Sequence, residues 1–242
     1  MASAKRVIPQ IPPPREWQSR LKAVIKPGLV PLTLLLRRRP IARYLAREPR
    51  PKLHVGCGGY LLPGWLNTDL SILNRRQVTY LDVRKKLPFP DESFSYVFNE
   101  HLISYLTLEE GIRFFKECHR VLRPGGVLRT ATAGWPFLLQ LGQSNDIHHR
   151  DYVRWATDQF LKVGYYSRCL VMNNFLYVIG SKMIYDPECL TWALSQAGFS
   201  QIIPAKVGES LHPELRGVEG HGKFIPAEFN ELETFVLEAT KV

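Results

Sequence analysis

The sequence predicts an α/β protein built on an open, mostly parallel β-sheet. Short apolar runs that end in glycine or polar residues alternate with amphipathic segments, as in strand–helix–strand units. Polar clusters follow four successive predicted strands, and parallel sheets bind ligands at the edge formed by the carboxyl ends of their strands. The 242 residues are enough for one domain with a sizeable core and some additions.

The first predicted strand, residues 52–55, leads into the glycine turn Gly56-Cys57-Gly58-Gly59. Glycine lets the backbone approach a ligand closely and adopt dihedral angles that a Cβ forbids. The second strand, residues 66–70, carries Asp69, whose carboxylate could accept hydrogen bonds from both hydroxyls of a ribose. An ordinary glycine turn between two strands would show the same pattern.

The spacing argues against a dinucleotide cofactor. The pattern G-x-G-x-x-G beginning at Gly56 would need glycine at position 61, where the chain has Leu61. Asp69 also follows Gly56 more closely than the roughly 20 residues typical of nicotinamide enzymes. A mononucleoside cofactor without a pyrophosphate fits this spacing better.

The third predicted strand, residues 78–81, is followed by Asp82 and Val83. A carboxylate and an apolar side chain at this place suit the amine and the ring of an adenine, although aspartate is also common in turns. The fourth strand, residues 94–98, ends at Asn99-Glu100-His101. This segment is the last of the four polar clusters expected at one edge of the sheet.

A helix is expected to begin at Asn145-Asp146, and the chain outside the insertion at 134–180 is expected to hold two more helices and three strands. The expected ranges are 107–122 and 186–198 for the helices, and 127–132, 201–207 and 233–240 for the strands. Thr107-Leu108-Glu109-Glu110 is a capping box that begins the first helix. Arg123-Pro124-Gly125-Gly126 is expected to be a turn between that helix and the fifth strand.

Several motifs together resemble the class I S-adenosylmethionine-dependent methyltransferases, most of all their small type 11 branch. The motifs are L-H-V-G-C-G (53–58), N-T-D-L (67–70), D-V (82–83), L-P-F-P-D-E-S-F-S-Y-V-F-N-E-H (87–101) and R-V-L-R-P-G-G-V-L (120–128). The likeness is strong over residues 52–132 and weaker from residue 185 to the last strand. It implies a Rossmann-like, seven-stranded, mostly parallel sheet closed by a hairpin, with S-adenosyl-L-methionine as cofactor and methyl transfer as activity.

The resemblance also implies cofactor-binding roles at the sheet edge. Gly56, Cys57 and Gly58 would surround the methionine part, Asp69 with Leu70 would hold the ribose, Asp82 and Val83 would hold the adenine, and Asn99 and His101 would close the site. Relatives often read E-H-x-x-E-H after the fourth strand. This chain has only the first Glu-His pair, because Ser104-Tyr105 stands where the second would be.

The net charge of +10 is concentrated in residues 1–52, which we expect to form a basic, proline-interrupted arm before a methyltransferase domain at 53–242. Three interpretations of residues 15–48 stay open. They could dock leucines on the domain, or make a peripheral contact with an anionic membrane. They could also bind nucleic acid, which we consider unlikely because aromatic residues for base stacking are scarce there.

Residues 134–180 form an insertion that is expected to cap the acceptor site, and 208–231 form a long loop. If the acceptor is a hydroxyl, a general base helps to remove its proton. The candidate catalytic bases are His101, His148, His149 and His221.

Composition and motifs narrow the acceptor and the setting. The cysteines and histidines show no metal-ligand spacing, and no signal peptide or membrane-spanning run is visible, so we expect a metal-free cytoplasmic protein, with or without peripheral membrane contact. Motifs for methylating nucleic-acid bases are absent. We therefore expect a small-molecule, sugar or lipid-linked hydroxyl acceptor, with two alternatives: an RNA methyltransferase that uses the basic arm, or a non-catalytic cofactor-binding scaffold. The sequence indicates no oligomeric state.

Overall fold

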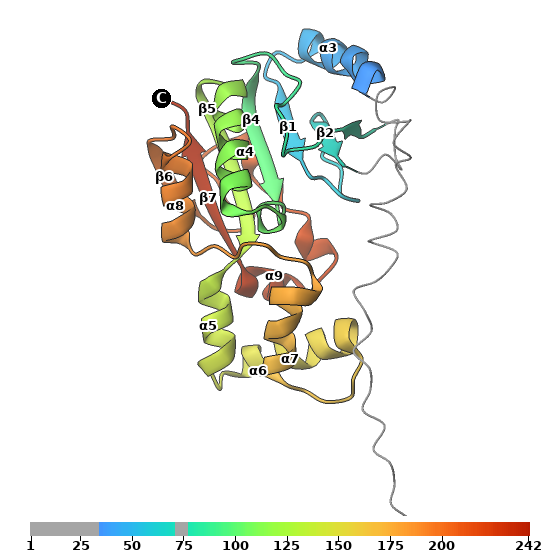
Figure 1. The fold of residues 1–242 in the computed structure, drawn as a ribbon, viewed down its shortest axis with the longest axis vertical. Coiled ribbons are helices and arrows are strands. Elements are labelled where there is room, and N and C mark those ends of the chain that lie inside the picture. The colour runs from blue at the N-terminus through green and yellow to red at the C-terminus, as the bar shows by residue number, and fades with distance from the viewer. Residues whose placement is uncertain (1–33, 71–76) are drawn as a thin grey trace, which may run out of the picture.

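The computed structural model describes residues 34–70 and 77–242, and it is built around a seven-stranded sheet in the order β3-β2-β1-β4-β5-β7-β6 (Figure 1). Strands β1 to β5 run parallel, whereas β7 is antiparallel to both of its neighbours, β5 and β6. The strands are β1 (Lys52–Val55), β2 (Leu66–Asp69), β3 (Thr79–Tyr80), β4 (Phe94–Glu100), β5 (Leu122–Ala133), β6 (Gln201–Ala205) and β7 (Thr234–Thr240). The predicted seven-stranded, mostly parallel α/β fold is confirmed.

The helices form two groups around this sheet. Helices α4 and α8 pack side by side on one face, whereas α5, α6, α7 and α9 gather beyond the carboxyl ends of the strands (Figure 1). The α-helices are α3 (Arg38–Arg47), α4 (Leu108–Val121), α5 (Trp135–Gln143), α6 (Ile147–Ala156), α7 (Arg168–Asn173), α8 (Pro187–Ser195) and α9 (Ala227–Glu233). The second group therefore covers the sheet edge at which the sequence predicts the ligands.

Separate apolar clusters hold the two groups. The main core lies between the sheet and helices α4 and α8, with Phe94, Phe114 and Phe115 fully buried. A second cluster, which includes Phe137, Tyr152 and others from α7 and α9, holds the helices beyond the strand ends together. The capping helices thus have an apolar core of their own.

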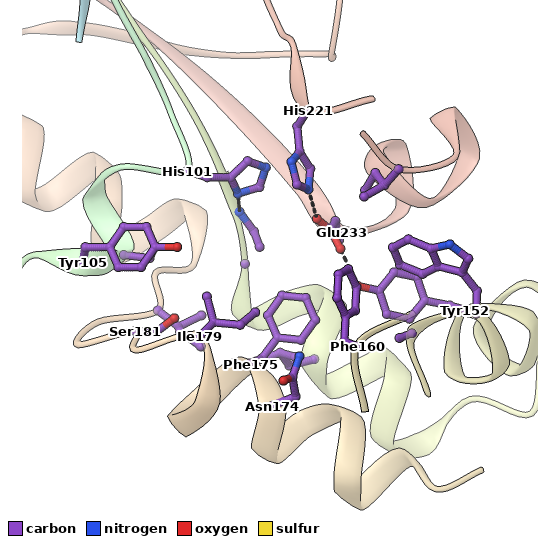
Figure 2. A pocket seen from close by; sticks show the side chains of 18 residues that line it. His101, Tyr105, Tyr152, Phe160, Asn174, Phe175, Ile179, Ser181, His221 and Glu233 are labelled. Carbon is purple, nitrogen blue, oxygen red and sulfur yellow. Dashed lines mark hydrogen bonds and ion pairs between the residues drawn. The ribbon is translucent and has the colours of Figure 1, made fainter. Parts of the chain in front are cut away.

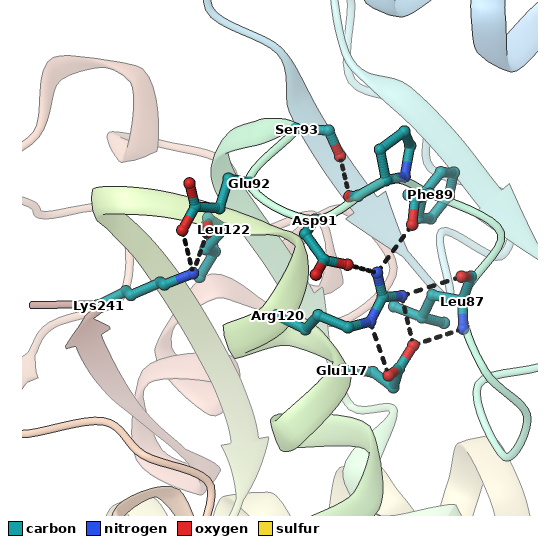
Figure 3. A network of polar contacts seen from close by, with 10 residues as sticks. Leu87, Phe89, Asp91, Glu92, Ser93, Glu117, Arg120, Leu122 and Lys241 are labelled. Carbon is teal, nitrogen blue, oxygen red and sulfur yellow. Dashed lines mark hydrogen bonds and ion pairs between the residues drawn. The ribbon is translucent and has the colours of Figure 1, made fainter.

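The start of β4 is fixed by a single arginine of α4 (Figure 3). The Arg120 guanidinium donates to the carbonyl oxygens of Leu87 (3.0 Å) and Phe89 (2.9 Å), and it pairs with Asp91 and Glu117 (both 2.6 Å). These bonds hold the proline-containing segment 87–91, which precedes β4, against helix α4. The motif at residues 87–92 therefore has a structural role at the opposite end of β4 from His101.

The prediction that Arg123-Pro124-Gly125-Gly126 forms a turn separate from the fifth strand is wrong. The segment belongs to β5, which begins at Leu122 and pairs with β4 through a register shift between Phe94 and Tyr96. Gly125 takes a φ of 75°, a value that favours glycine, so the irregularity is absorbed within the strand. The capping box at Thr107 is confirmed, because Thr107 and Glu110 exchange hydrogen bonds.

Three further helices were not predicted. Helix α5 begins directly after β5, α7 lies within the insertion, and α9 occupies the end of the segment expected to be a loop to residue 231. Helix α6 was expected: its N-cap Asp146 accepts a hydrogen bond from the His148 N–H (2.7 Å). The structure therefore has a more helical cap than the sequence indicates.

Helix α3 is the described part of the basic arm, and residues 1–33 of that arm lie outside the described residues. Ile41 is buried, Tyr44 and Leu45 pack against the main core, and Arg43 and Arg47 are exposed. Helix α3 thus docks its apolar side chains on the domain, whereas Leu35 and Leu36 just before it are exposed. Within the described parts of the chain, none of the helices has the length and the apolar character to cross a membrane.

Candidate active site

The turn after β1 presents backbone N–H groups at the sheet edge. Gly56 and Gly58 have φ values of 71° and 53°, which favour glycine, and the N–H groups of Gly56 and Cys57 both bind the carbonyl oxygen of Thr68 (2.8 and 3.0 Å). The next N–H, that of Gly58, donates to Oδ2 of Asp69 (3.0 Å). The turn and the acid at the end of β2 are therefore held together as one unit.

Asp82 is already engaged within the protein. Its carboxylate accepts hydrogen bonds from Nε (2.8 Å), a terminal nitrogen (2.9 Å) and the backbone N–H (3.1 Å) of Arg84. Burial raises the pKa of Asp82, but the Arg84 bonds outweigh it, so the pKa lies below its usual value. Val83 is buried in the main core, and Leu70 is exposed. An adenine would have to share Asp82 with Arg84.

Asn99 places a buried polar atom at the end of β4. Its Nδ2 donates to Oγ1 of Thr130 (3.0 Å), whereas its Oδ1 is buried and has no hydrogen-bond partner among the described residues. An unpaired buried acceptor is costly, so a ligand donor at this place would stabilise it. Together with Asp69 and the glycine turn, this atom fits an adenosyl-type cofactor.

A cavity of about 360 Å³ opens between the sheet edge and the cap (Figure 2). Its walls are mostly apolar, and one polar group lies where the ends of β4 and β5 and the start of β7 meet the 3-10 turn His221–Lys223. The apolar lining residues include Leu138, Trp155, Phe160, Phe175, Ile179, Ile184 and Ile225. The polar group consists of His101, Tyr152, His221 and Glu233, and further polar side chains come from Ser104, Tyr105, Asn174 and Ser181.

His101 lies directly after β4, with a left-handed φ of 48°. The backbone N–H of Ala133 donates to its Nδ1 (3.3 Å), and its Nε2 lies 3.5 Å from Oγ1 of Thr234, which itself donates to Asn230. These bonds assign the neutral tautomer with the proton on Nε2. Burial, and then the neighbouring His221, lower the pKa of His101 to about 3. Its ring therefore has no lone pair free to take a proton.

His221 has the opposite arrangement. Its Nε2–H donates to Oε1 of Glu233 (3.0 Å), and the hydroxyl of Tyr152 donates to the second oxygen of the same carboxylate. Glu233 is buried, and burial followed by the charge of Glu233 raises the pKa of Tyr152 well above its usual value. Among the described residues, none donates a hydrogen bond to Nδ1 of His221, so this nitrogen keeps its lone pair.

The other two candidate histidines do not line the cavity. His148 is exposed on α6, and His149 is buried within the cap, where its ring stacks on Phe137. Both ring nitrogens of His149 are buried without a hydrogen-bond partner among the described residues. Of the four predicted bases, the structure therefore brings only His101 and His221 together, with ring centroids 4.2 Å apart.

Glu233 is the functional candidate that sequence reasoning missed, because it was expected as the first residue of a strand. Ligand atoms of His101, His221 and Glu233 lie within 4.8 Å of one another, so the group could also hold a divalent cation. To do so, His101 would have to give up its Nε2 proton or the bond from Ala133. The tautomer assigned above favours a hydrogen-bonded group.

One family model and several solved structures are similar to this chain. Residues 72–130 match the family model described as a methyltransferase domain. A search of curated proteins found no match. Similar solved structures include a possible histamine N-methyltransferase of Thermotoga maritima (18% identity, 92% of this chain and 98% of that chain, TM-score 0.45). Another is an S-adenosylmethionine-dependent methyltransferase of Mesorhizobium loti (17% identity, 84% and 97%, TM-score 0.48).

The strand order of the sheet and the methyltransferase-domain match define the class of the protein. Residues 72–130 match a methyltransferase domain, and this match together with the seven-stranded fold supports S-adenosylmethionine-dependent methyl transfer with S-adenosyl-L-methionine as the cofactor. The solved structures, all distant, leave its acceptor open.

Proposed function

We propose that the protein methylates a hydroxyl group of an uncharged, largely apolar small molecule, such as a phenol or an alcohol. The observation that carries this proposal is the distribution of side chains around the cavity. Aromatic and aliphatic residues line most of it, and its titratable polar group is formed by His101, His221, Glu233 and Tyr152, whereas the other polar side chains are the neutral Ser104, Tyr105, Asn174 and Ser181. Such a cavity favours an acceptor with one polar end and an apolar body.

The charges of the wall support the same acceptor class. No lysine or arginine is found among the described residues that line the cavity, and its only acid is Glu233. A phosphate group would need cationic partners. The lining therefore favours an uncharged acceptor over a phosphate-bearing one, and the mostly apolar walls favour a largely apolar body over a sugar.

We assign the general base to His221 and not to His101. A hydroxyl bound near Nδ1 of His221 can transfer its proton there, and the Glu233 carboxylate stabilises the resulting imidazolium through the Nε2–H bond. Tyr152 holds the second carboxylate oxygen and so fixes the orientation of Glu233. When bound, the cofactor supplies an electrophilic methyl group.

Around this base, the other described residues orient and enclose the reactants. The turn at Gly56 and Gly58 and the carboxylate of Asp69 would hold the cofactor at the strand ends. Phe175 and Ile179 face the polar group from the cap and would exclude water from the acceptor (Figure 2). The ordered cavity favours a transferase over a scaffold protein that only binds the cofactor.

The acceptor class can be tested with methyl-labelled S-adenosylmethionine and a panel of acceptors. The panel holds uncharged phenols and alcohols, simple glycosides, phosphate esters, aromatic amines and RNA. We expect label transfer to phenols or alcohols alone, measured as radioactivity extracted into organic solvent or precipitated with RNA. Transfer confined to glycosides, phosphate esters, amines or RNA would contradict the proposed acceptor.

A further inference from the structure

The 3-10 turn His221–Lys223, which carries the proposed base, is fixed from the sheet by Glu100. Glu100 is the last residue of β4. One of its carboxylate oxygens accepts a hydrogen bond from the Gly220 N–H (2.8 Å), and both lie 3.1 Å from the N–H of His221. A half-buried carboxylate thus binds two backbone donors at the beginning of the turn. The turn has no side-chain cap of its own.

A buried ion group holds the loop that leads into the same turn. Arg129 of β5 is fully buried and pairs with Glu219 (2.6 Å) and Glu238 (2.5 Å). It also donates to the backbone oxygens of Lys206 and Glu209, at the start of that loop. Glu219 is therefore held in place next to Gly220. Glu100 then has to position only the two following residues, Gly220 and His221.

The cofactor turn contacts the base turn from the other side. A Cβ on Gly220 would lie 2.0 Å from an atom of the Tyr60 ring, so only glycine fits there. The Lys223 ammonium donates to the Tyr60 hydroxyl (3.0 Å) and lies 4.3 Å from the ring centroid. Tyr60 follows the glycine turn at Gly56–Gly59, so the turn that would hold the cofactor packs on the turn that holds the base.

We propose that Glu100 is a positioning residue that fixes His221 relative to the cavity. This inference rests on the proposed role of His221 as base. Glu100 is not among the residues that line the cavity, so it would act through the backbone of Gly220 and His221. It also gives a role to the single Glu-His pair after β4: the glutamate orients a distant histidine, and the adjacent His101 binds the backbone of β5.

The test uses Glu100→Gln, which keeps the size of the side chain but places an amide donor opposite two backbone donors. Glu109→Gln is the matched control, because Glu109 is exposed on α4 and pairs only with Arg113. Three quantities are measured: the histidine ring signals by NMR, the cofactor dissociation constant by calorimetry, and kcat with a phenol acceptor. The His221 signals are assigned by their loss in His221→Gln.

In Glu100→Gln, we expect displaced His221 ring signals, a cofactor affinity within about twofold of wild type and a kcat reduced about 10- to 100-fold, as for a misplaced catalytic group. Glu109→Gln should match wild type. Unmoved His221 signals in a folded Glu100→Gln protein would overturn the proposal. Should that variant not fold, Glu100→Asp, which keeps the charge but reaches less far, must displace the same signals. The NMR result needs no acceptor, so it separates a failure of this inference from a failure of the proposed function.

Discussion

The two halves of the site are built in different ways. The half at the cofactor edge comes from the ends of β1, β2 and β4, and uses backbone N–H groups and short polar side chains within residues 56–99. The acceptor cavity draws its walls from several helices, turns and loops between residues 101 and 233, and it uses large side chains. The first half depends on the local course of the backbone at the strand ends, whereas the second depends on how separate helices and turns pack together.

This difference indicates which half can change its specificity. A cofactor bound by the backbone of a glycine turn and by one carboxylate would depend on few side chains. The residues that recognise it would then be placed by the fold itself. The acceptor cavity can change with any of its aromatic residues while the sheet edge stays intact. Variants that affect one half and spare the other therefore test the distinction.

The largest effect is expected from Arg129→Ala, which leaves Glu219 and Glu238 buried without their partner. Because an unpaired buried charge is strongly unfavourable, the free energy of unfolding should fall by about 3–5 kcal/mol in denaturant titrations. Arg113→Ala, which removes an exposed pair with Glu109, should cost less than about 1 kcal/mol. Equal losses in the two variants would mean that the acceptor side does not depend on the buried ion group.

A change on the cofactor side should weaken cofactor binding more than it weakens the fold. In Asp69→Ala the carboxylate that would accept the ribose hydroxyls is removed, and bonds to charged groups contribute about 1.5–3 kcal/mol. Calorimetric titration with S-adenosylmethionine should therefore show an affinity about 10- to 100-fold lower. The exposed Asp151→Asn serves as the control. An unchanged affinity in Asp69→Ala would remove Asp69 from the cofactor site.

Tyr152→Phe should affect only the acceptor side. It removes the hydroxyl that donates to the buried carboxylate of Glu233, so thermal or denaturant unfolding should show a loss of about 1–2 kcal/mol. Cofactor affinity should stay at the wild-type value. Tyr165→Phe, at an exposed position of the cap, should change neither quantity. A weaker cofactor affinity in Tyr152→Phe would show that the two halves are coupled through Glu233.

A smaller effect concerns acid stability on the cofactor side. His54 of β1 is buried and hydrogen-bonded to Asn67 (3.0 Å), and burial lowers its pKa from 6.5 to about 4. Between these pH values the unfolded chain binds more protons than the folded protein. The free energy of unfolding should therefore decrease as the pH is lowered from 6.5 to 4, by at most about 1.4 kcal/mol per pH unit for this group. In His54→Phe the slope should be shallower between pH 6.5 and 4. The exposed His148→Gln should keep the wild-type slope, and an unchanged slope in His54→Phe would contradict the assignment.

The sequence was sufficient for the sheet and its ligand edge because both follow from local patterns. The glycine turn, Asp69 and Asn99 each lie at the end of a recognisable strand. Glu233 could not be found in this way, since its partners Tyr152 and His221 come from other elements and nothing local distinguishes it from a strand residue. His221 was one of four candidate bases, behind His101, until the hydrogen bonds separated the two. Helix α9 was hidden by its short length and by the polar loop before it.

The most direct test of the account compares His221→Gln with His148→Gln in the labelled-methyl assay with a phenol acceptor. The account predicts a kcat about 100-fold or more below wild type for His221→Gln, the usual loss for a general base, and no change for His148→Gln. Cofactor affinity, measured in parallel by calorimetry, should be the same in all three proteins. Equal rates in His221→Gln and wild type would contradict the assignment of His221 and Glu233 as the catalytic pair.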